Sequence, residues 1–155
     1  MPPLFFNTPF GLKLQMSEVV TEIIRFIKAD PKRSYKIIIG SDSQEIKEKE
    51  ADFVTAIVVH RRGNGGRYFW RHLDPAARGG KFHTLRDRII KEVLLSLDVA
   101  KEVLTELKKE PAVLNWDFEI HADIGENGET KVLIQEVVGM IRANNFEVKT
   151  KPESY

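Results

Sequence analysis

The stretch Tyr35-Lys36-Ile37-Ile38-Ile39-Gly40 decides the fold. Three consecutive isoleucines before a glycine are typical of a short strand buried in a sheet. Residues 53–60 predict a second strand and residues 67–72 a third. The glycine-rich segment 63–66 between them is a strong turn signal, so these two strands should form a hairpin. The sheet therefore begins with three consecutive strands.

Helical periodicity surrounds these strands on both sides. Apolar residues recur at helical spacing over residues 17–29 and over the long segment 84–109. A strand at 117–122, a helix at 130–143 with Val132 facing inward, and a strand at 146–150 complete the pattern. The order of elements is helix, three strands, helix, strand, helix, strand. It predicts an α/β protein with helices packed on a five-stranded sheet. The sheet is expected to be mixed (α+β), with both parallel and antiparallel strands.

Length and composition place the chain among single-domain globular proteins. It has 155 residues, no cysteine, 24 basic residues and 23 acidic ones. Disulfide scaffolds, cysteine-ligated zinc and thiol catalysis are excluded. The apolar runs are too short to span a membrane, and the N-terminus lacks the features of a signal peptide. We expect one cytoplasmic domain over residues 1–155, of which residues 1–33 are an N-terminal extension and helix.

Positive charge is concentrated in one segment. Residues 60–88 contain eight Lys or Arg residues and two Asp residues, a net charge of +6 within a chain of total charge +1. The aromatic run Tyr68-Phe69-Trp70 lies among them. Bases interleaved with aromatics are typical of surfaces that follow a phosphate backbone. A hairpin whose solvated outer face is rich in arginine is the alternative. The nucleic-acid contacts predicted here are Arg67, Arg71, Lys81 and Arg86.

Three carboxylates stand out. Asp42 follows the isoleucine-rich strand, and Asp123 follows the fourth strand. If these strands are neighbours, the two acids converge, although Asp is also common where any strand gives way to a turn. Glu92 flanks the apolar stripe of the long helix, where the alternative is a surface pair with Arg88. Converging carboxylates raise one another's pKa unless a cation neutralises them, and Mg²⁺ or Mn²⁺ suits such oxygen ligands.

These elements and acids resemble a known fold. The segments 39–44, 88–92, 121–125 and 151–155 resemble a small family of uncharacterised bacterial proteins in the ribonuclease H-like superfamily. The resemblance implies that Asp42 bridges two metal ions, with Glu92 and Asp123 as further ligands and catalytic acids. The superfamily usually adds a fourth ligand in a C-terminal helix. That helix is expected to be absent from this sequence, which leaves the ligand set incomplete.

Three functions follow as hypotheses. The first is a Mg²⁺- or Mn²⁺-dependent nuclease that cleaves RNA, an RNA–DNA hybrid or structured DNA by a two-metal mechanism. The second is a nucleic-acid-binding module on the same fold without catalysis. The third is a protein-interaction module, such as a homodimer, in which the hairpin aromatics form the interface.

Overall fold

The computed structural model describes residues 5–73, 80–110, 116–124 and 131–150. Its elements follow the predicted order, preceded by two short strands. They are β1 Phe6–Asn7, β2 Lys13–Leu14, α1 Met16–Ala29, β3 Tyr35–Lys47, β4 Glu50–Arg61, β5 Gly66–Leu73, α2 Leu85–Leu107, β6 Trp116–His121, the 3-10 helix Lys131–Leu133, α3 Ile134–Ala143 and β7 Glu147–Lys149. None of the described helices is long and apolar enough to cross a membrane.

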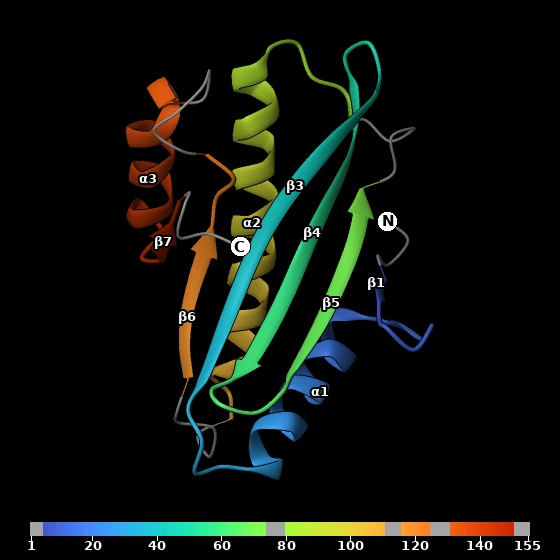
Figure 1. Ribbon diagram of the computed structural model, residues 1–155, viewed down its shortest axis with the longest axis vertical. Helices are drawn as coiled ribbons and strands as arrows, with labels where there is room; N and C mark the ends of the chain where they lie inside the picture. The colour runs from blue at the N-terminus through green and yellow to red at the C-terminus, as the bar shows by residue number, and fades with distance from the viewer. Residues whose placement is uncertain (1–4, 74–79, 111–115, 125–130, 151–155) are drawn as a thin grey trace.

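The strands form one mixed sheet in the order β2-β1-β5-β4-β3-β6-β7 (Figure 1). β3, β4 and β5 are antiparallel to one another, whereas β6 is parallel to β3 and β7 is parallel to β6. The prediction of five strands is therefore wrong in number, because β1 and β2 extend the sheet beyond β5. The predicted strand order is also wrong as an arrangement in space, because β3, the first long strand, is an interior strand between β4 and β6.

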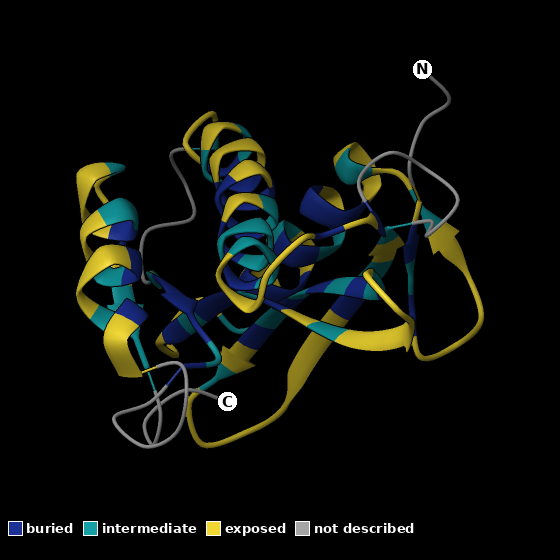
Figure 2. Cartoon of the chain, turned by 90° about the horizontal axis from the view of Figure 1, so that it is seen from above, coloured by how far each residue is buried: buried dark blue, intermediate teal, exposed yellow. Residues whose placement is uncertain are grey.

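One face of the sheet is covered by helices, and the other carries none of the described ones. Ile37 and Ile39 of β3 belong to a single core cluster with the buried residues of α1, α2 and α3. Seen from above in Figure 2, the helices lie on one side of the strands. Successive side chains of a strand point to opposite faces. Ile38, Gly40 and Asp42 therefore point to the other side, which we call the open face.

Helix ends are set by local hydrogen bonds. Thr84 caps α2, since its hydroxyl accepts a hydrogen bond of 3.1 Å from the backbone N–H of Asp87. For α1 the cap is Gln15, whose backbone N–H donates to the Glu18 carboxylate at 3.0 Å. At the other end of the chain, Val132 is 84% exposed, so its predicted inward orientation is wrong. It lies in the 3-10 turn before α3, where the helical spacing does not apply.

Candidate carboxylate site

The fold brings the ends of β3 and β6 together. These parallel neighbours are paired up to Gly40 and His121, and Asp42 and Asp123 each lie two residues further on. β3 continues as a strand to Lys47, so Asp42 lies within it rather than after it. Because the two strands are parallel and in register, the two aspartates lie at the same distance along the sheet. This is the arrangement expected above if the two strands are neighbours.

A groove on the open face contains both aspartates. Its volume is about 410 Å³, and it is lined by Ile38, Gly40, Ser41, Asp42, Val54, Ala56, Val58, His121 and Asp123. A second, smaller cavity lies under α2 and is lined by Glu92, Ser96 and Asp123 among others. Asp123 borders both cavities. It therefore lies between the groove that contains Asp42 and the space beneath the helix that carries Glu92.

The electrostatics of Glu92 reflect both aspartates. The pKa of Glu92 is raised from 4.5 to about 7, mainly by burial and also by the negative charges of Asp42 and Asp123, which together outweigh the opposing effects of Ser43 and Arg88. A carboxyl group with this pKa carries a proton in a large fraction of molecules at neutral pH. All three predicted acids therefore share one electrostatic environment.

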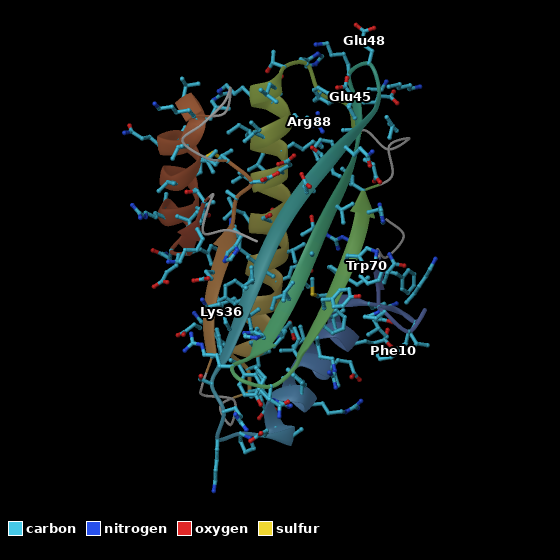
Figure 3. All side chains as sticks on the ribbon, in the orientation of Figure 1. Phe10, Lys36, Glu45, Glu48, Trp70 and Arg88 are labelled. Carbon is cyan, nitrogen blue, oxygen red and sulfur yellow. The ribbon has the colours of Figure 1, made fainter. Side chains whose placement is uncertain are left out.

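Ser43 and Arg88 hold Glu92 in place. The Ser43 hydroxyl donates a hydrogen bond to Glu92 Oε2. Arg88 donates from Nε to Ser43 Oγ at 2.7 Å and from Nη2 to the Ser43 carbonyl at 2.8 Å. Figure 3 shows Arg88 beside the end of β3, near Glu45. Ser43 thus stands between Arg88 and Glu92, and this linkage was not predicted, because sequence spacing alone does not show which helix residue a strand hydroxyl meets.

The donor chemistry suits a divalent cation, but the arrangement does not form a complete site. Carboxylate oxygens are the ligands that Mg²⁺ and Mn²⁺ prefer. Within the described ranges, however, no group of three or more His, Asp or Glu side chains is placed so that it could hold a metal ion.

The four predicted nucleic-acid contacts do not form one strip. The guanidinium groups of Arg67 and Arg71 lie over the rings of Phe26 and Phe6, at 4.5 and 4.8 Å from the ring centroids. Burial lowers the pKa of Arg71, while Glu102 and Asp98 of α2 oppose that shift.

The other two lie elsewhere. Lys81 pairs with Glu50 in an isolated β-bridge beside the β3–β4 hairpin, and Arg86 binds Glu136 from the start of α2.

Two clusters of buried polar side chains near Asp42 and Asp123 were not predicted. On the open face, Glu119 accepts a 2.9 Å hydrogen bond from His121 Nε2 in the ion-paired form, and the Lys36 ammonium lies 3.3 Å from the same oxygen. Under α2, the Ser41 hydroxyl lies 2.8 Å from those of Thr55 and Ser96. The first has a signal in the sequence, since residues 119 and 121 alternate on one face of a strand.

Comparison with known proteins supports the fold and leaves the chemistry open. A family model described as Ribonuclease H-like matches residues 18–155. The chain is 35% identical over 163 aligned residues to "Uncharacterized protein YkuK" of Bacillus subtilis (strain 168), an alignment that covers 98% of this chain and 91% of that protein. No solved structure matches the chain significantly. The mixed sheet, the helices on one of its faces and these matches agree: the chain belongs to the ribonuclease H-like family.

Proposed function

We propose that this protein is a metal-dependent nuclease that cleaves phosphodiester bonds in RNA, RNA–DNA hybrids or structured DNA. The observation that carries the proposal is the placement of Asp42 and Asp123 in one groove, two residues beyond the last paired positions of β3 and β6, close to Glu92. Burial and these two charges raise the pKa of Glu92 to about 7, which supports it. Buried groups of like charge destabilise one another, and functional sites are a common place for such an arrangement.

Each acid has a separate part in this proposal. Asp42 and Asp123, which line the groove, would hold Mg²⁺ or Mn²⁺ together with Glu92. A bound divalent cation supplies an activated water and stabilises the leaving oxygen of the phosphodiester. Ser43 and Arg88 orient the Glu92 carboxyl group, and Arg88 offsets part of the negative charge around it.

The test is cleavage by the protein and by Asp42→Asn in the presence of Mg²⁺ or Mn²⁺. The substrates are labelled single-stranded RNA, an RNA–DNA hybrid and a branched DNA. We expect the substitution to abolish cleavage while the circular dichroism spectrum stays unchanged. Asp117→Asn is the matched control, because Asp117 forms a 2.8 Å ion pair with Arg62 far along the sheet from Asp42. Cleavage that persists undiminished in Asp42→Asn would overturn the proposal.

A nucleic-acid-binding module without catalysis is the second candidate. It is favoured by the lack of a complete three-ligand arrangement among the described residues. It predicts binding of the same substrates in EDTA, without cleavage at any concentration of divalent ion. Two assays on the same substrates separate the functions: binding in EDTA, and cleavage in Mg²⁺ or Mn²⁺. Binding without cleavage favours the module, and cleavage favours the nuclease.

A further inference from the structure

The open face of the sheet carries a trough beside the aspartates. The register of the sheet places His121, Gly40, Ala56 and Trp70 in one row across β6, β3, β4 and β5. The two middle residues of this row have almost no side chain. The surface is therefore recessed between the His121 and Trp70 side chains, and this recess is the trough. Gly40 and Ala56 also line the groove of about 410 Å³ that contains the aspartates.

A pair of stacked aromatic rings stands at one side of the trough. Tyr68 and Trp70 alternate on β5, so both point to the open face. Their ring centroids are 5.5 Å apart with an interplanar angle of 23°, and Tyr68 is 49% exposed. Figure 3 shows Trp70 on β5, on the side of the sheet away from α2. Trp70 is partly buried and Tyr68 is exposed, so this stacked pair offers a flat, partly accessible surface to another planar group.

The aromatic pair and the carboxylates lie within reach of one short ligand. Asp42 and Trp70 are two strands apart and two residues out of line, which corresponds to about 12 Å between their Cα positions. The apolar residues Val54, Ala56 and Val58 of β4 lie between them on the same face. The groove that contains Asp42 is therefore bordered on β4 by residues whose neighbours on β5 include the aromatic pair.

The charges of this face indicate how a ligand would be held. Lys36 is paired with Glu119, and His72 lies 3.0 Å from both carboxylate oxygens of Asp52. Among the described residues of this face, these basic side chains are therefore paired with acids and do not form a cluster that would attract phosphates. Affinity has to come from planar and apolar contact, which suits exposed bases and does not suit a duplex, whose bases are stacked inside.

We propose that the open face is a stacking platform for unpaired bases, on which Tyr68 and Trp70 bind a single strand of RNA or DNA that runs toward Asp42. Aromatic side chains on an open sheet bind bases in this way with little sequence preference. The relevance of the path to cleavage rests on the proposed function, but the binding itself does not.

The experiment uses Trp70 as its own reporter. The chain has two tryptophans, so Trp116→Phe leaves Trp70 as the sole one. Its fluorescence is followed in EDTA during titration with oligo-dT, with oligo-dT of equal length whose central residues are abasic, and with a duplex. We expect quenching by oligo-dT, and much weaker quenching by the abasic strand, which keeps the phosphates but lacks the bases.

Variants then localise the contact. Trp70→Ala and Tyr68→Ala should each weaken binding of a labelled oligo-dT by roughly 5- to 150-fold. Ala56→Leu raises the floor of the trough and keeps both rings, so it should also weaken binding even if an alanine variant fails to fold. Phe10→Ala is the matched control, because Phe10 is another exposed aromatic residue, 85% exposed, and it lies in the connection between β1 and β2 rather than on β5.

Two results would overturn the platform. One is equal affinity for oligo-dT and the abasic strand. The other is unchanged oligo-dT affinity in a folded Trp70→Ala and in Ala56→Leu. A change in sedimentation mass on Trp70→Ala without oligo-dT binding would assign the face to a protein partner instead. Failure of the nuclease proposal is distinguishable, because oligo-dT binding in EDTA that depends on Trp70 stands whether or not Asp42 supports cleavage.

Discussion

Glu92 and Glu119 lie in two regions of the same small sheet, and their environments shift their pKa values in opposite directions. Glu92, under α2, is close to Asp42 and Asp123, and its pKa rises to about 7. For Glu119, on β6, burial also raises the pKa, but hydrogen bonds and charge from His121 and Lys36 outweigh it, so the net shift is downward. The neighbours of Glu119 stabilise its charged form, whereas the two aspartates near Glu92 destabilise the charged form of Glu92. The comparison separates a structural acid from a candidate functional one.

The largest expected effect is the loss of Glu119. The substitution Glu119→Ala leaves His121 buried and Lys36 half-buried without their shared partner. Removal of one member of a buried charged pair destabilises a protein by about 3–5 kcal/mol, and partial exposure of Lys36 places this case near the lower figure. Urea denaturation at pH 7 measures it. A loss below about 1 kcal/mol, the range of surface pairs, would remove the distinction between the two glutamates.

The contribution of Glu119 should also depend on pH. Its folded pKa is below the ordinary value of 4.5, so the folded state binds fewer protons than the unfolded state around that pH. The stability it contributes is present above pH 4.5 and is lost as the pH falls through the folded pKa. The difference in unfolding free energy between the protein and Glu119→Gln should therefore shrink on acidification. A constant difference down to pH 3 would contradict the assigned shift.

For Glu92→Gln, the effect on the free energy of unfolding should depend on pH with the opposite sign. Because the folded pKa of Glu92 is raised from 4.5 to about 7, the folded state holds a proton that the unfolded state releases between these values. The stability of the protein therefore falls as the pH rises through this window, by at most about 3 kcal/mol. Glu92→Gln should be the more stable protein at pH 8 and should lose that advantage near pH 4.5. Thermal unfolding across this range measures the effect, and an advantage that does not change with pH would count against it.

Manganese should distinguish the two regions directly. If Asp42, Asp123 and Glu92 hold Mn²⁺, a concentration one hundred times the dissociation constant stabilises the folded state by about 2.7 kcal/mol. The melting temperature should rise in the protein and in Glu119→Gln, whereas Asp42→Asn should show a much smaller rise. An equal rise in all three would place the ion elsewhere.

The smallest expected effect belongs to Ser43. Its hydroxyl stabilises the charged form of Glu92, so Ser43→Ala should raise the pKa of Glu92 further. Loss of one such hydrogen bond changes stability by about 1 kcal/mol. Carbon-13 NMR titration of the glutamate carboxyl groups reads the shift directly. A pKa that falls on this substitution would show that the hydrogen bond favours the neutral acid.

Local sequence patterns predicted the three helices and the five longer strands. β-branched runs, helical spacing and glycine turns are properties of neighbouring residues, and they do not depend on the rest of the fold. β1 and β2 were missed because each has only two residues, too few to show alternation. The tip of the β3–β4 hairpin was missed because its left-handed position is Lys49, with φ of 61°, rather than a glycine or asparagine.

For the site, the predicted acids came from a resemblance together with their positions near strand ends. The structure places Asp42 and Asp123 in one groove and couples Glu92 to both. Their role as metal ligands stays a prediction. Arg67 and Arg71 could not be placed from sequence, because a one-residue change in strand register decides which face an arginine takes.

The interior position of β3, between β4 and β6, has a consequence for how the chain folds during synthesis. β3, β4 and β5 are joined by short turns and can pair as soon as they emerge, whereas β6 pairs with β3 across 81 residues, as at Ile38 and Glu119. At about 5–20 residues per second, β6 leaves the ribosome roughly 4–15 s after β3. During that interval the isoleucine-rich strand is an unpaired edge, which is the form in which strands aggregate. Slow synthesis between residues 61 and 116 would lengthen this exposure, so the yield of folded protein should depend on translation rate there.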